Sequence, residues 1–132
     1  MATWQEIGID NFRAGMALFD SPSPHYRSAT SRFYYATFCV LTHELLRRGA
    51  GSEFRDQRAT PGHAQLPRLV ETYFIHFSRE RLDNLVAYIA TLYRDRILAD
   101  YSQQPVDRQA VTKTLRAAEK VFRYLEVKHE RK

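Results

Sequence analysis

The sequence has few of the features that mark secreted, disulfide-bonded or membrane proteins. Cys39 is the one cysteine, so no disulfide can form within the chain, and this suits a reducing compartment. No apolar run approaches the ~20 residues that a helix needs to cross a bilayer. The first residues also lack the basic stretch and apolar segment of a secretory signal. The sequence therefore predicts a cytoplasmic protein without membrane attachment.

The motifs of common catalytic sites are missing as well. The five histidines show no spacing typical of metal ligands, and a single cysteine cannot build a zinc site. Neither a Gly-rich phosphate loop nor a Gly-x-Ser-x-Gly nucleophile elbow occurs. We therefore expect no metal and no other cofactor, and we expect neither a Rossmann-type nor a serine-hydrolase active site.

The chain does contain enough apolar sequence for one core, together with an excess of positive charge. Its 132 residues, of which 44% are hydrophobic, fit a single domain spanning 1–132. The net charge is +5, and sixteen of the twenty basic residues are arginines, whose planar guanidinium suits phosphates. This charge permits binding of RNA or nucleotides but is too modest to establish it.

Apolar residues recur with the spacing of α-helices, and no stretch alternates as a half-buried strand would. Thr3 and Glu6 form the pattern of a capping box, which opens a first helix that ends before Asp20. Further helices are expected at His25–Arg48, at about His63–Phe77, from Ser78 to about Tyr101, and from Asp107 into the charged tail 128–132, with a loop at 51–61. Short connections make neighbouring helices antiparallel, so the predicted fold is an all-α, up-and-down bundle of four to five helices.

The second expected helix is apolar around most of its circumference. Only Arg32, His43 and Arg47, with the small Ala36 between them, form a polar strip along it. Such a helix is central in a bundle or shared with a second subunit. We expect a homodimer, because the apolar surface exceeds what one small core covers. The strip fits a track for phosphates, although a solvated surface is the favoured interpretation.

Two charges fall on the apolar face of the helix that follows Ser78. Arg96 and Asp100 are four residues apart and can pair, and Tyr101 can add a hydroxyl beside them. One interpretation is a structural ion pair that fixes the end of the helix, because a lone buried charge is costly. The other is a cleft in which Arg96 binds a phosphate and Asp100 orients it. The pattern alone favours the structural interpretation.

Three segments together resemble proteins with a HEPN domain. Residues 31–38, SRFYYATF, resemble the small-Arg-x-Tyr-Tyr-Ala motif of the second helix in that family. Residues 92–101, LYRDRILADY, resemble the hallmark of one bacterial subfamily, which reads Leu-Tyr, then Arg, then Ala-Asp-Tyr. His63 lies where that subfamily has a histidine before a short third helix, and the closing helix around 117–122 also fits. The resemblance runs across nearly the whole chain, in order and with compatible spacing.

The resemblance implies a homodimeric helical bundle with a cleft formed partly between subunits. Many HEPN proteins are RNA-cleaving toxins or defence proteins, and many are encoded beside a minimal nucleotidyltransferase that acts as antitoxin. The nuclease members use an arginine and a histidine a short spacer apart, and they need no metal. In this chain Tyr101 stands where the histidine is expected after Arg96.

These arguments give six candidate site residues. The candidate catalytic residues are Arg96 and Tyr101, and the candidate substrate-binding residues are Asp100, Arg32, Tyr35 and His63. Two further Arg–His pairs of suitable spacing are interpreted as coincidental: Arg58 with His63, and Arg123 with His129.

The leading hypothesis is a protein of a toxin–antitoxin or defence module that binds RNA or a nucleotide. Metal-independent endoribonuclease activity is left open, because a tyrosine hydroxyl, which titrates near ~10, is a poor general base at neutral pH. The alternative is a non-catalytic, dimeric interaction module that docks a partner nucleotidyltransferase.

Overall fold

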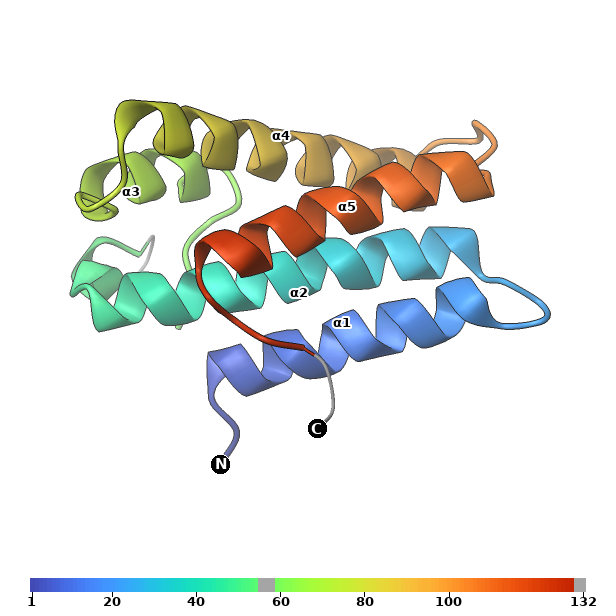
Figure 1. The fold of residues 1–132 in the computed structure, drawn as a ribbon, viewed down its shortest axis with the longest axis horizontal. Helices are drawn as coiled ribbons and strands as arrows, with labels where there is room; N and C mark the ends of the chain where they lie inside the picture. The colour runs from blue at the N-terminus through green and yellow to red at the C-terminus, as the bar shows by residue number, and fades with distance from the viewer. Residues whose placement is uncertain (55–58, 130–132) are drawn as a thin grey trace.

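The computed structural model describes residues 1–54 and 59–129. Within them the chain forms five α-helices, one 3₁₀ helix and no strand. The elements are α1 (Trp4–Asp20), α2 (Tyr26–Arg47), η1 (Ala50–Glu53), α3 (Leu66–Tyr73), α4 (Arg79–Tyr101) and α5 (Arg108–Tyr124). The long helices α1, α2, α4 and α5 alternate in direction along the chain, so that α5 packs parallel to α2 and antiparallel to α4, and the short α3 lies beside the start of α4 (Figure 1). The prediction of an all-α helical bundle is confirmed.

The helices begin where the sequence places their caps. Thr3 accepts a hydrogen bond from the backbone N–H of Glu6, and Glu6 accepts one in return from that of Thr3, which completes the capping box. The side chains of Ser78 and Asp107 cap α4 and α5. Gly49, after α2, has a φ of 84°, a left-handed conformation that glycine adopts without steric cost.

The region between α2 and α4 differs from its prediction. The helix expected at about His63–Phe77 is shorter and spans only Leu66–Tyr73. Before it, the side chain of Gln65 accepts a hydrogen bond from the N–H of Gly62 and holds a turn rather than a first helical turn. The predicted loop also contains η1, and its residues 55–58 lie outside the described part of the chain.

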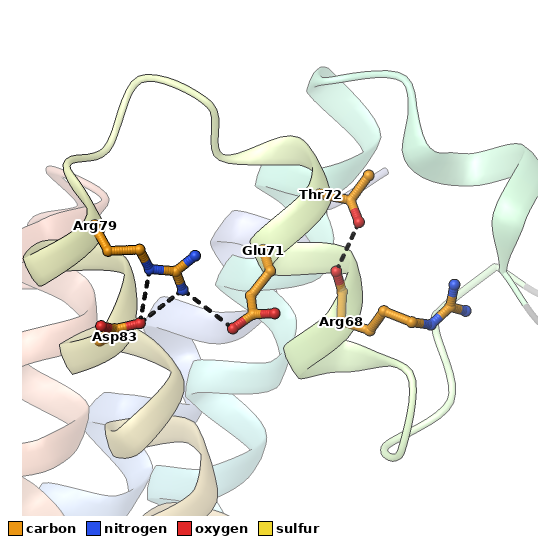
Figure 2. A network of polar contacts seen from close by, with 5 residues as sticks. All are labelled: Arg68, Glu71, Thr72, Arg79 and Asp83. Carbon is orange, nitrogen blue, oxygen red and sulfur yellow. Dashed lines mark hydrogen bonds and ion pairs between the residues drawn. The ribbon is translucent and has the colours of Figure 1, made fainter.

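Figure 2 shows how α3 is joined to the start of α4. The guanidinium of Arg79 lies 2.6 Å from a carboxylate oxygen of Asp83 and 3.3 Å from one of Glu71. All three side chains are largely exposed, and exposed ion pairs contribute about 0–1 kcal/mol. The orientation of α3 therefore depends mainly on its buried residues Leu66, Leu69 and Val70.

The central position of α2 is confirmed, but its apolar surface is covered within one chain. α2 contacts α1, α4 and α5, and its only exposed large apolar side chains are Tyr35 and Leu46. The polar strip predicted on this helix is not a continuous solvated surface, because Ala36 in its middle is fully buried. The excess apolar surface thus gives no argument for a second copy, and the homodimer stays a prediction.

Ala36 is buried because α1 comes unusually close to α2. A Cβ atom added to Gly8 would lie 2.7 Å from Cγ1 of Val40 and 2.9 Å from the carbonyl oxygen of Ala36. A Cβ on Gly15 would lie 2.7 Å from the ring of Phe33. The two glycines, seven residues apart on one face of α1, therefore permit this close packing.

The centre of the core is Phe12, which is fully buried. Its ring lies 5.4 Å from that of Phe33, 5.0 Å from that of Phe122 and 4.1 Å from that of His129, measured between centroids. The carbonyl of His129 also accepts a hydrogen bond of 2.8 Å from Nε of Arg13. His129 is thus packed on the core.

The C-terminal end of α4 is held by one side chain of α2. Nη1 of Arg27 donates to the carbonyl oxygens of Ala99 and Ser102, both at 2.8 Å, and Nη2 donates to that of Gln104 at 2.5 Å. These contacts satisfy carbonyls that a helix end leaves without partners. They also fix the turn of α4 that carries Arg96 and Asp100. Among the described residues, no helix has the length and apolar character to cross a membrane.

Candidate functional site

A cavity of about 880 Å³ opens between α1, α2, α4 and the loop before α3. This volume is in the range of small-molecule and cofactor sites, about 300–1,000 Å³. Its lining comes from four separate segments: Trp4 and Asn11 of α1; Ser31, Arg32, Tyr34, Tyr35 and Phe38 of α2; Thr60, Pro61, Gly62 and His63 of the loop; and Arg96 and Asp100 of α4. We call this cavity the cleft.

Five of the six candidate residues line the cleft: Arg32, Tyr35, His63, Arg96 and Asp100. They come from three elements that the sequence keeps far apart. Tyr101 does not line it. As the last residue of α4 it lies roughly 140° around the helix from Arg96. Its side chain is 73% exposed, with its ring 5.8 Å from the guanidinium carbon of Arg96.

Arg96 and Asp100 form the predicted pair, with Nε of Arg96 3.1 Å from Oδ2 of Asp100. The other carboxylate oxygen accepts a hydrogen bond from the hydroxyl of Ser31 on α2. The side chains are 26% and 30% exposed and line the cleft, so the pair is not enclosed in the core. Near its C-terminal end the inward side of α4 faces the cleft and not packed side chains, so both charged groups keep contact with water.

The pairing leaves part of the Arg96 guanidinium free. Asp100 is bonded to Nε, and the two terminal nitrogens have no hydrogen bond or ion pair within residues 1–54 and 59–129. Because the guanidinium is planar and rigid, a contact at Nε also fixes the direction of its two terminal nitrogens. Ser31 on α2 donates a hydrogen bond to Asp100, so a network of hydrogen bonds links α2 through Asp100 to the Arg96 guanidinium.

Tyr34 joins the cation to His63. Its ring lies 5.7 Å from the guanidinium carbon of Arg96, and its hydroxyl lies 2.5 Å from Nδ1 of His63. The His63 ring packs 4.8 Å from that of Phe38. Tyr34 was not predicted to belong to the site, because its position on the apolar stripe of α2 is that of an ordinary core residue. The feature that could have identified Tyr34 as a site residue is its hydroxyl, because a buried tyrosine hydroxyl needs a hydrogen-bond partner.

Asn11 and Arg32 cross the cleft from α1 to α2. Nη1 of Arg32 donates to the side-chain oxygen of Asn11 at 2.8 Å, and the Asn11 amide donates to the carbonyl of Ile7 at 2.9 Å. Asn11 is buried, and the sequence analysis missed it along with Trp4. Arg32 is exposed, as predicted for the solvated strip, and its bond to Asn11 also holds it at the wall of the cleft.

The environment of the cleft changes the ionisation of His63 and Tyr34. Burial lowers the pKa of His63, and the nearby positive charge of Arg96 lowers it further. Burial raises the pKa of Tyr34, although Arg96 opposes this effect. At neutral pH His63 is therefore an uncharged imidazole, and Tyr34 keeps its phenolic proton.

We expect His63 to titrate below its ordinary pKa of 6.5, and Arg96→Met to raise that pKa by removing the nearby charge. Because the folded state resists a proton that the unfolded chain accepts, His63 lowers stability as the pH falls below 6.5. NMR of the His63 imidazole signals against pH measures its pKa in the wild type and in Arg96→Met. Arg94→Met, on the exposed side of α4, is the control. A pKa unchanged by Arg96→Met would contradict the assigned cause.

Other chemistry has less support. Cys39 is fully buried, and burial raises its pKa to about 11, so its thiol stays protonated and is no nucleophile. In the part of the chain that the structure describes, no three His, Cys, Asp or Glu side chains cluster closely enough to hold a metal ion. Of the Arg–His pair at positions 58 and 63, Arg58 lies outside the described residues.

Comparisons with known proteins add no relative. No family model matches the chain, and neither a curated protein nor a solved structure does.

Proposed function

We propose that the protein binds RNA or a nucleotide, with a phosphate in the cleft held by Arg96. The observation that carries this proposal is the arrangement of Arg96: Asp100 holds its Nε at 3.1 Å, and the two terminal nitrogens remain available in an open cavity. Two parallel N–H donors match two oxygens of one phosphate. The HEPN resemblance of residues 31–38 and 92–101 supports the same assignment, because both segments line the cleft.

The remaining charges of the cleft also favour an anion. Among the described residues, Arg32 and Arg96 line it with Asp100 as the one carboxylate, and Ser31 and Arg96 already bind that carboxylate. A neutralised Asp100 repels a phosphate less than a free one would. The cleft thus combines a fixed cation with polar groups of α1 and α2, as expected of a phosphate site.

Binding should weaken with salt in proportion to the few arginines involved. With two phosphate contacts to a single strand, affinity is expected to fall about fivefold for a threefold rise in salt. Fluorescence anisotropy of a labelled RNA oligonucleotide, titrated at several sodium chloride concentrations, measures the slope. An affinity that does not change with salt would mean that phosphate contacts are not the basis of binding.

A second candidate function is RNA cleavage, with His63 rather than Tyr101 as the base. The observation in its favour is that an uncharged His63 lines the same cleft as Arg96. If Nδ1–H of His63 donates to the Tyr34 oxygen, Nε2 is free to accept a proton. Nε2 then takes the proton of a ribose 2′-hydroxyl, whose oxygen attacks phosphorus. The bond to the 5′-oxygen breaks and that oxygen takes a proton from water, which gives a 2′,3′-cyclic phosphate and a 5′-hydroxyl.

This proposal predicts that His63→Asn lowers the cleavage rate at least ~100-fold, in line with the usual contribution of a general base. RNA affinity should change little, because phosphate binding is assigned to arginine. Tyr101→Phe separates the two candidate bases, and it should cleave at the wild-type rate. Single-turnover cleavage of end-labelled RNA measures the rates. Loss of activity in Tyr101→Phe, with His63→Asn active, would return the role to Tyr101.

A further inference from the structure

The lining of the cleft includes a partly exposed aromatic ring. Tyr35 lines the cleft and is 39% exposed, although its neighbours Tyr34 and Ala36 in α2 are buried. Its ring runs nearly parallel to that of Phe38, with an interplanar angle of 14° and centroids 6.2 Å apart, which is an offset arrangement. Phe38 is 4% exposed, so the Tyr35 ring lies beside a buried aromatic residue. Tyr35 therefore offers an aromatic ring that a ligand in the cleft can reach.

The dimensions of the cleft limit what can reach this ring. Its floor runs along α2 from Ser31 to Phe38, a rise of roughly 10 Å at ~1.5 Å per residue. α1 and α4 border the cleft on either side of α2: α1 contributes Trp4 and Asn11, and α4 contributes Arg96 and Asp100. Such a space accommodates one or two nucleotides.

A nucleic-acid duplex fits this geometry poorly. Its bases are stacked on each other inside the helix, and proteins that bind double-stranded RNA contact phosphates and 2′-hydroxyls over about 16 base pairs. Here the two arginines that line the cleft among the described residues, Arg32 and Arg96, belong to one cavity. An unpaired nucleotide, in contrast, offers a free base face and a phosphate at the same time.

We infer that the cleft takes an unpaired nucleotide, as found in single-stranded RNA, with its base stacked on Tyr35 and its phosphate on Arg96. This inference rests on the proposed function. Tyr35 and Arg96 then have different roles. The Tyr35 ring stacks on an unpaired base, which a duplex does not offer, while the Arg96 guanidinium binds the phosphate of any strand.

The chain carries its own probe for the test. Trp4 is the one tryptophan and it lines the cleft, so its fluorescence reports occupancy without a label. The probes are a ten-nucleotide single-stranded RNA, the same strand annealed to its complement, and a nucleoside monophosphate. The protein variants are Tyr35→Phe, which keeps the ring, and Tyr35→Leu, which keeps apolar bulk without a ring.

The single strand is expected to bind at least tenfold more tightly than the duplex, and Tyr35→Leu to weaken it about tenfold or more while Tyr35→Phe does not. Binding of the monophosphate as tightly as the strand also supports an unpaired nucleotide and identifies its source as free nucleotide. Equal affinity for strand and duplex, or an unchanged Tyr35→Leu, would overturn the inference while phosphate binding by Arg96 stands. If none of the probes binds, the proposed function itself fails.

Discussion

Arg96→Ala is expected to weaken RNA binding at least tenfold while the protein stays folded. Hydrogen bonds to a charged group contribute about 1.5–3 kcal/mol, which corresponds to roughly 10- to 150-fold in affinity. The loss is expected at the top of this range, because a bidentate contact disappears together with the charge. Equilibrium binding of a labelled RNA, at fixed salt concentration, gives the change directly.

The same substitution should have little effect on stability. A buried carboxylate left without its partner would cost about 3–5 kcal/mol. Asp100 is instead 30% exposed and keeps the hydroxyl of Ser31, so solvent screens much of the lost interaction. We expect the free energy of unfolding to fall by no more than about 1 kcal/mol.

Two further variants control this experiment. Arg94→Ala removes a cation from the same helix whose side chain is 69% exposed, and it should bind RNA as the wild type does. Arg96→Lys keeps the charge but loses the planar fork, so it should recover only part of the affinity. Wild-type binding by Arg96→Ala would refute Arg96 as the phosphate ligand. Unfolding of that variant would show that its role is structural.

The largest loss of stability is expected from Phe12→Ala. Phe12 is fully buried where α1, α2, α5 and the segment ending at His129 meet, and truncation leaves a cavity among three aromatic rings. Replacement of a buried phenylalanine by alanine costs about 3–5 kcal/mol. This is a large part of the total stability of a typical domain, about 5–15 kcal/mol.

Urea denaturation followed by circular dichroism measures the cost. Ile75→Ala serves as the matched control, because it removes apolar atoms from a side chain that is 76% exposed. Its free energy of unfolding should stay within about 0.5 kcal/mol of the wild type. A Phe12→Ala protein as stable as this control would mean that the core does not centre on Phe12.

The helices could be predicted because their signals are local. The caps at Thr3, Ser78 and Asp107 involve neighbours three residues away, and apolar periodicity depends only on position along one helix. The pairing of Arg96 with Asp100 is local in the same sense. The error in α3 arose where a turn held by Gln65 replaced the first helical turn.

The rest of the cleft depends on contacts between elements. The bond of Tyr34 to His63 spans α2 and the following loop, and that of Arg32 to Asn11 spans α2 and α1. A helical wheel shows which residues share a face but not which neighbour covers that face. The burial of Ala36 under α1 could not be predicted for this reason, although Arg32 and Arg47 of the same strip are exposed as expected.

The construction of the cleft couples ligand binding to folding of the whole domain. Its lining begins at Trp4 and ends at Asp100, so α1, α2 and α4 must be assembled, with the loop before α3, before a ligand can bind. A ligand that binds only this assembled state stabilises it by about 2.7 kcal/mol at a free concentration of 100 times its dissociation constant. Its presence should raise the melting temperature and slow amide hydrogen exchange in α1 as well as in α2 and α4. The amide protons of α1, distant in sequence from Arg96, would thus report an event at the phosphate.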